Sequence, residues 1–159
     1  MKKNKKKQQN ILPLIIVIVL ILILIFIPVF LSSNKDKKIF TFSTSEFKHI
    51  TAIGVNEFVA TMDDSHKSII FICNNENKDC YDMLTILDSI ADERSIYVEY
   101  INVLELTDEE REYMQGNYEY LKDSLYPKLL LINNKRVATN DAFLTKEEIV
   151  EELDSFIKE

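Results

Sequence analysis

The sequence predicts an α/β domain, a central mixed sheet flanked by helices, that is preceded by one N-terminal transmembrane helix. Short runs of β-branched and aromatic residues alternate with segments whose apolar residues recur at helical spacing, which is typical of α/β domains. A stretch of uncharged apolar residues covers positions 11–31. With 159 residues, the chain is long enough for one domain with a substantial core.

The N-terminal region predicts a membrane anchor. Residues 1–10 form a basic tail with five lysines, and residues 11–31 form an apolar run of 21 residues without charge. At about 1.5 Å per residue, a helix of that length spans the hydrocarbon core of a bilayer, about 30 Å. A cleaved signal peptide is the alternative, but the run is too long and Leu31-Ser32-Ser33-Asn34 is a poor cleavage site. We therefore expect an uncleaved signal anchor.

The charges beside the anchor predict its orientation. Five lysines precede the span, whereas three lysines and one aspartate follow it closely. The larger positive charge favours a cytoplasmic N-terminus. We expect a single-pass protein of the cell membrane, with residues 32–46 as a linker and residues 47–159 as an extracytoplasmic domain. The abundance of lysine, asparagine and isoleucine is typical of bacterial proteins from genomes of low G+C content.

The first elements of the domain lead to its central unit. Residues 47–53 alternate loosely in polarity and predict an edge strand, and apolar residues at helical spacing predict a helix over residues 54–62. Residues 69–72 form a β-branched and aromatic run that predicts a buried strand, and asparagines follow it as a loop. A helix then opens at Cys80. One face of that helix is apolar and predicts its buried side: Cys80, Met83, Leu84, Leu87, Ile90 and Ala91.

A third strand and a second amphipathic helix follow the central unit. Residues 95–103 alternate in polarity, and a strand–helix–strand unit of this kind requires a parallel crossover. Thr107 and Glu110 form a capping box that opens a helix over residues 107–121, which Gly116 and its neighbour can kink or split. Three tyrosines in this segment either cover the sheet or bind a partner: Tyr113, Tyr118 and Tyr120.

A hairpin and a helix complete the domain. Residues 128–132 and 136–140 predict two antiparallel strands, joined at Asn133–Asn134, residues that suit a turn with positive φ. A second capping box begins at Thr145 and opens the last helix, residues 145–157. The apolar stripe of that helix contains Ile149, Leu153, Phe156 and Ile157.

Three separated segments resemble the thioredoxin family, in the order in which that family has them. Residues 86–93 resemble the second helix of a thioredoxin, residues 126–131 resemble the loop with its cis-proline and the strand after it, and residues 133–137 resemble the next hairpin. The resemblance covers about residue 47 to the C-terminus. It implies a thioredoxin-like fold for the whole domain.

The same resemblance implies a degenerate active site. The Cys-x-x-Cys motif of the family aligns with Asn77-Lys78-Asp79-Cys80, so Asn77 replaces the nucleophilic cysteine and Cys80 holds the second position. Phe71 stands about where the family has a buried acid that assists proton transfer. In the family, clients bind beside the cis-proline. The implied client-binding residues are Asn77, Lys78, Tyr126 and Pro127.

Cys73 and Cys80 allow two interpretations. They form a disulfide or redox pair across the loop, if the domain faces an oxidising space, or they are two separately buried thiols. A cysteine at the positive end of a helix favours its thiolate form. Cys80 is therefore a candidate catalytic residue, alone or with Cys73.

Composition argues against other chemistry. Two scattered histidines and two cysteines lack the spacing of a zinc site, and a chain with two glycines has no phosphate-binding loop. We expect no metal and no cofactor. From Ile39 onward the chain has 11 Lys and Arg residues against 25 Asp and Glu residues, so nucleic acid is not an expected partner.

Two functions therefore compete. In the first, the domain is a non-catalytic module that binds a client or belongs to a membrane-protein complex, which the missing cysteine and the missing acid favour. In the second, it is a thiol–disulfide oxidoreductase that acts through Cys80, for example as an accessory factor for an exported peptide or protein.

Overall fold

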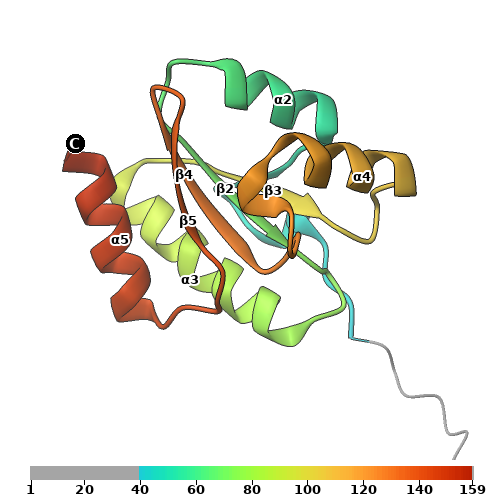
Figure 1. Cartoon of the computed structure of the whole chain (residues 1–159). Coiled ribbons are helices and arrows are strands. Elements are labelled where there is room, and N and C mark those ends of the chain that lie inside the picture. The colour runs from blue at the N-terminus through green and yellow to red at the C-terminus, as the bar shows by residue number, and fades with distance from the viewer. Residues whose placement is uncertain (1–39, 159) are drawn as a thin grey trace, which may run out of the picture. The chain divides into compact units, whose positions relative to one another are not determined.

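A computed structural model describes residues 40–158 (Figure 1). The predicted basic tail, the predicted transmembrane helix and most of the predicted linker lie outside these residues. Within them, no helix is long and apolar enough to cross a membrane. The elements are η1 (Thr44–Glu46), β1 (Ile50–Ala52), α2 (Val55–Asp63), β2 (Ser68–Cys73), α3 (Lys78–Arg94), β3 (Val98–Asn102), α4 (Asp108–Asn117), η2 (Glu119–Leu121), β4 (Lys128–Asn133), β5 (Arg136–Asn140) and α5 (Lys146–Lys158).

The centre of the domain is a five-stranded mixed sheet with the order β1-β3-β2-β4-β5. Strand β3 pairs in parallel with β1 and with β2, whereas β4 pairs antiparallel with β2 and with β5. The predicted α/β architecture is confirmed, and β1 lies at the edge of the sheet as expected. The parallel pairing brings the carboxyl ends of β1, β2 and β3 to the same edge of the sheet.

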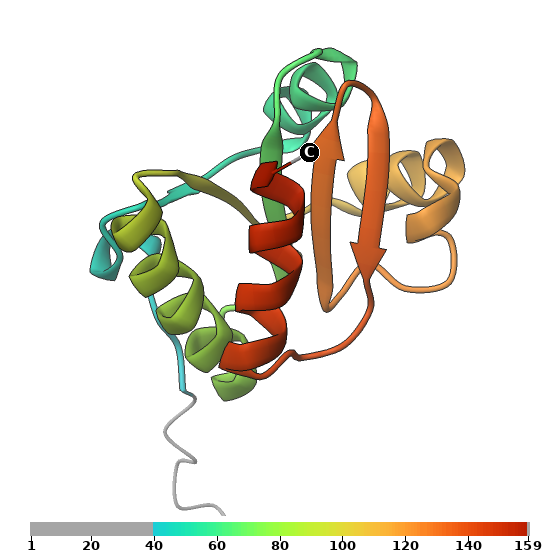
Figure 2. The ribbon, with the colours of Figure 1, turned by 90° about the vertical axis from the view of Figure 1, so that its left-hand side faces the viewer.

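Helices cover both faces of the sheet (Figures 1 and 2). Helices α3 and α5 lie on one face, where they pack against alternate strand residues such as Phe71 and Leu129. Helices α2 and α4 lie on the other face, against residues such as Ile70 and Leu130. Because β2 and β4 bury both of their faces, they consist of nearly continuous apolar runs.

The local signals that define α3 act as the sequence predicts. Its buried residues are the expected set, Cys80, Met83, Leu84, Leu87, Ile90 and Ala91. The side chain of Asn77 caps the helix by accepting a hydrogen bond of 2.7 Å from the backbone N–H of Asp79. The helix ends at Ser95, which adopts the left-handed conformation.

The helix expected over residues 107–121 splits at Asn117 into α4 and η2, beside Gly116, where the sequence analysis expected a kink or a split. The structure differs from the predicted elements in three places. The hairpin turn has positive φ at Asn134 and Lys135, one residue later than expected. Ile157, expected in the buried stripe of α5, is 40% exposed. Residues 40–46, expected in the linker, belong to the folded unit, with Phe42 only 6% exposed.

Candidate functional site

A disulfide bond joins Cys73 to Cys80 at the carboxyl edge of the parallel strands. Cys73 is the last residue of β2 and Cys80 lies in the first turn of α3, and their Cα atoms are 6.0 Å apart. Both residues are 0% exposed. The spacing left open either a disulfide pair or two separate thiols, and the structure contains the disulfide pair.

Hydrogen bonds hold both halves of the disulfide in place. The carbonyl oxygen of Cys73 accepts from the backbone N–H of Val103 at 2.9 Å and from the hydroxyl of Tyr100 at 3.5 Å. Burial raises the pKa of Tyr100, so its hydroxyl stays protonated and can donate. On the other side of the bridge, the backbone N–H of Asn74 donates to Sγ of Cys80 at 3.3 Å.

The loop between the two cysteines is fixed by asparagine side chains. The side chain of Asn74 accepts from the backbone N–H of Glu76 at 2.7 Å, and Asn77 caps α3. Asn102 at the end of β3 accepts from the backbone N–H of Asn75 at 3.3 Å. These bonds satisfy the polar backbone of the loop and hold it over the buried sulfur atoms.

A second layer lies over this loop. We name residues 40–42 the covering segment, because the backbone N–H of Phe42 donates to the carbonyl oxygen of Asn75 at 3.2 Å. The ring of Phe42 lies 5.5 Å from that of Tyr81, the residue next to Cys80, and 6.1 Å from that of Tyr100. The covering segment therefore adds an aromatic layer to the side of the disulfide loop.

Asn77, at the aligned position of the family's first cysteine, has no thiol. Asn77 is occupied as a helix cap, and the exposed Lys78 pairs with Asp82 at 2.6 Å along the helix surface. Phe71, at the position of the family's buried acid, is 0% exposed and faces α3. Neither of these two aligned positions therefore provides a thiol or a carboxyl group.

The loop before β4 lies next to the disulfide. Because Lys128 pairs with Ile72 in the antiparallel register, the next positions outward, Pro127 and Cys73, lie beside each other. The peptide bond between Tyr126 and Pro127 is cis, as the family resemblance implies. Tyr126 is 41% exposed. The structure thus brings the six residues predicted for the site to one edge of the domain: Cys73, Asn77, Lys78, Cys80, Tyr126 and Pro127.

The backbone of Tyr126 is occupied by a neighbouring hydroxyl. Oγ of Ser124 donates to the carbonyl oxygen of Tyr126 at 2.7 Å and accepts from its N–H at 3.3 Å. Both contacts are exposed to solvent. A client strand that pairs with Tyr126 would have to displace this hydroxyl.

One charged residue of this edge escaped the sequence analysis. Lys128 is 4% exposed, and its ammonium group lies 2.7 Å from the carboxylate of Asp141, just beyond β5. A lysine directly after a proline gives no sign of burial by itself. The signal that could have found the pair is the hairpin register, which places Asp141 next to the partner of Leu129.

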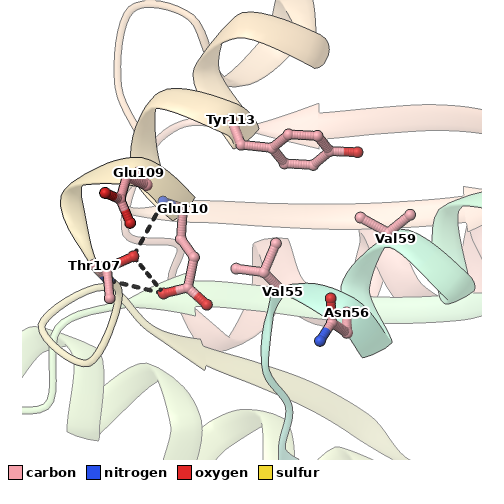
Figure 3. Close-up of a pocket in the computed structure, with 7 residues that line it drawn as sticks. All are labelled: Val55, Asn56, Val59, Thr107, Glu109, Glu110 and Tyr113. Carbon is pink, nitrogen blue, oxygen red and sulfur yellow. Dashed lines mark hydrogen bonds between the residues drawn. The ribbon is translucent and has the colours of Figure 1, made fainter.

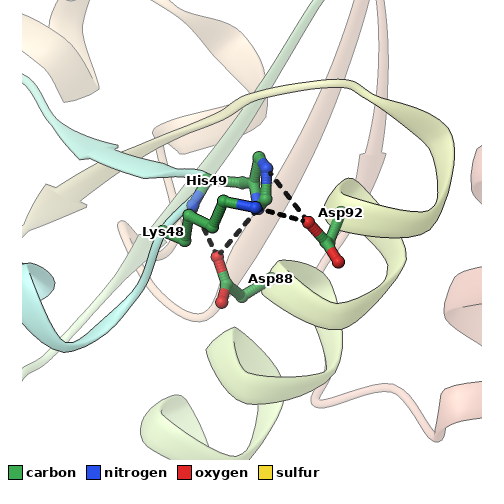
Figure 4. A network of polar contacts seen from close by, with 4 residues as sticks. All are labelled: Lys48, His49, Asp88 and Asp92. Carbon is green, nitrogen blue, oxygen red and sulfur yellow. Dashed lines mark hydrogen bonds and ion pairs between the residues drawn. The ribbon is translucent and has the colours of Figure 1, made fainter.

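A polar network at the amino ends of the parallel strands connects the start of β1 to α3 (Figure 4). The backbone N–H of His49 donates to Asp88 at 2.6 Å, and its ring lies 3.5 Å from Asp92. Lys48 pairs with Asp92 at 2.9 Å, which lowers the pKa of that carboxyl. Within residues 40–158, no group of three or more histidine, cysteine and acidic side chains is arranged to hold a metal ion.

Comparison with solved structures identifies the fold. Thioredoxin O2 from Arabidopsis thaliana, in its oxidised state, superposes with a TM-score of 0.54 at 10% identity, over 67% of this chain and 93% of that one. Thioredoxin NaTrxh from Nicotiana alata gives 0.55 at 15% identity, over 72% and 98%. The J-Trx1 fragment of ERdj5 gives 0.56 at 15% identity, over 73% of this chain and 55% of that fragment.

The domain therefore has a thioredoxin-like fold with a disulfide-bonded cysteine pair at the carboxyl edge of its sheet. At these identities the likeness shows the fold alone. No protein-family model matches the sequence. No curated protein matches it either.

Proposed function

We propose that the chain is a single-pass membrane protein whose thioredoxin-like domain lies outside the cytoplasm and binds client polypeptides without catalysing efficient thiol–disulfide exchange. The complete burial of Cys73 and Cys80 supports this proposal most directly. Exchange requires a thiolate to attack a disulfide sulfur, and access to that sulfur limits its rate. The loop and the covering segment restrict that access.

The proposed compartment rests on two independent observations. A disulfide persists in an oxidising space such as the outside of the cell, whereas thiol systems keep cysteines reduced in the cytoplasm. The lysine-rich start and the apolar run at residues 11–31 favour an anchor with its N-terminus in the cytoplasm. Both observations support a position of the domain on the outer side of the membrane.

The client surface is the edge formed by Asn77, Lys78, Tyr126 and Pro127. Tyr126 offers an exposed aromatic ring beside a backbone whose hydrogen-bonding groups are held by a serine hydroxyl that a client can replace. Aromatic side chains give large contact area for little loss of conformational entropy. An unfolded or exported peptide, presented at the membrane, is the kind of client that fits; a membrane-protein complex that exports such a peptide would be the setting.

A second candidate function is slow thiol–disulfide exchange through Cys80 and Cys73. It is favoured by the hydrogen bond from the backbone N–H of Asn74 to Sγ of Cys80 and by the position of that sulfur at the start of a long helix. Both features would stabilise a Cys80 thiolate after reduction. This function requires the loop to open.

Binding of an unfolded polypeptide tests the first proposal against the second. The probe is a reduced, carbamidomethylated polypeptide, which has no thiols, and the protein is the full chain in an uncharged detergent. We expect binding to survive in the Cys73→Ala/Cys80→Ala double variant and to fall in Tyr126→Ala. Tyr97→Ala is the matched control, because Tyr97 is 70% exposed and lies just before β3, at the amino ends of the parallel strands. Loss of binding in the double variant alone would contradict the proposal.

A further inference from the structure

A groove lies between α2 and α4, on the face of the sheet opposite to α3, α5 and the disulfide (Figure 3). Its volume is about 610 Å³. Val55 and Val59, one turn apart on α2, form one wall, and Tyr113 of α4 projects over them from the other side. The remaining lining residues are Asn56, Thr107, Glu109 and Glu110.

Tyr113 is the residue of this groove that packing does not explain. Tyr118 and Tyr120, which follow it, pack against the core between the sheet and α2. Of the two interpretations of these tyrosines, covering the sheet therefore describes Tyr118 and Tyr120. Tyr113 instead remains 43% exposed. An exposed aromatic ring over aliphatic side chains is typical of a surface that a protein partner covers.

The charge of the two helices that border the groove is mainly negative. Helices α2 and α4 carry six carboxylates and one arginine. The carboxylate of Glu110 is occupied by the capping box with Thr107, at 2.8 Å from its backbone N–H. Glu109 is exposed at the rim. The positive ends of both α2 and α4 lie at the groove and offset part of this charge, yet the excess of carboxylates on the two helices favours a cationic ligand.

We propose that this groove binds a cationic amphipathic segment of a protein partner, one that places aliphatic side chains against Val55, Val59 and Tyr113 and lysine or arginine beside Glu109. The first turns of α2 and α4 both border this groove, and an amphipathic helix can place its apolar face in a hydrophobic groove of this kind. The acidic rim selects against acidic partners and speeds encounter with basic ones. This site is separate from the client surface beside Pro127.

A peptide-binding measurement tests the inference. The probe is a short helical peptide of leucine and lysine with an apolar face, its counterpart has glutamate in place of lysine, and the protein is the full chain in an uncharged detergent. We expect saturable binding of the lysine peptide and none of the glutamate peptide. Glu109→Lys and Tyr113→Ala should each weaken binding by about fivefold or more, and Tyr113→Phe should retain it.

Glu151→Lys is the matched control, because Glu151 is exposed on α5, on the opposite face of the sheet, and the change of charge is the same. It should leave affinity within about twofold, since diffuse charge at that distance is largely screened. Equal weakening by Glu109→Lys and Glu151→Lys would overturn the inference, because attraction would then depend on net charge. Unchanged affinity in Tyr113→Ala, or absence of saturable binding, would also overturn it.

Discussion

The backbone N–H of Phe42 donates to the carbonyl oxygen of Asn75 across 3.2 Å, which fixes the start of the folded domain on the loop that separates Cys73 from Cys80. Phe42 is 6% exposed and packs against Tyr81. The covering segment therefore contributes, through Phe42, to the core cluster that buries the disulfide. Any movement of this segment would change how easily solvent thiols reach the two sulfurs.

Replacement of Phe42 tests this cover. We expect Phe42→Ala to cost about 3 kcal/mol of unfolding free energy, the usual cost of truncating a buried phenylalanine. It should also speed the reduction of the Cys73–Cys80 disulfide by dithiothreitol under native conditions. Leu153→Ala in α5 is the control, because it removes a core residue of similar burial. If both variants speed reduction equally at equal stability, global unfolding controls access and the covering segment does not.

Removal of the disulfide should cost stability without unfolding the domain. The bridge closes a loop with a sequence separation of 7 residues. The loss of loop-closure entropy then predicts that Cys73→Ala/Cys80→Ala lowers the free energy of unfolding by about 2.5 kcal/mol. Urea unfolding of the variant and of the oxidised parent measures the difference. An unchanged midpoint would mean that the bridge does not constrain the unfolded chain.

Substitutions of the two residues in the Lys128–Asp141 pair should destabilise the domain by different amounts. Asp141→Ala leaves the Lys128 ammonium, 4% exposed, without its partner at 2.7 Å. We expect a loss of about 2 kcal/mol, below the cost for a fully buried pair because Asp141 is 66% exposed. Lys128→Met removes the buried charge and should cost less. Thermal unfolding of both variants measures the order, and the reverse order would contradict the structure.

Glu99 provides a pH-dependent prediction. Burial raises the pKa of its carboxyl, and one of its oxygens has no hydrogen-bond partner within residues 40–158, while the other accepts from Thr61 at 3.3 Å. Folding raises the pKa of this carboxyl above its ordinary value of 4.5. The buried group therefore costs least stability at a pH below 4.5, where it is protonated, and destabilises the fold as it ionises at higher pH. Relative to the parent, Glu99→Gln should therefore gain stability as the pH rises above the ordinary pKa of 4.5. A pH-independent difference would show that Glu99 is protonated to the same extent in the unfolded chain.

Much of the fold follows from local signals in the sequence. The buried face of α3, the capping box at Thr107 and the break at Gly116 are each encoded within a few residues, and each was predicted correctly. Periodicity also distinguished the central strand from the helices. The thioredoxin-like fold of the whole domain was implied by the family resemblance, and the solved structures support it.

The parts that sequence could not predict depend on contacts between distant residues. Phe42 looked like part of a polar linker, because its partners, Tyr81 and Tyr100, come from other elements. The burial of Lys128 depends on the hairpin register, and the choice between two free thiols and a disulfide depends on the distance between the end of β2 and the first turn of α3.

The rate of disulfide reduction in a client tests the central claim most directly. Full-length protein in detergent is mixed with insulin and dithiothreitol, beside a Cys73→Ala/Asn77→Cys variant in which the thiol pair of the thioredoxin family is restored. We expect the parent to reduce insulin at the background rate, because its sulfurs are buried and position 77 is a helix cap. The variant should exceed that rate by about tenfold or more. A parent that already reduces insulin well above background would contradict the account and establish Cys73 and Cys80 as a working redox pair.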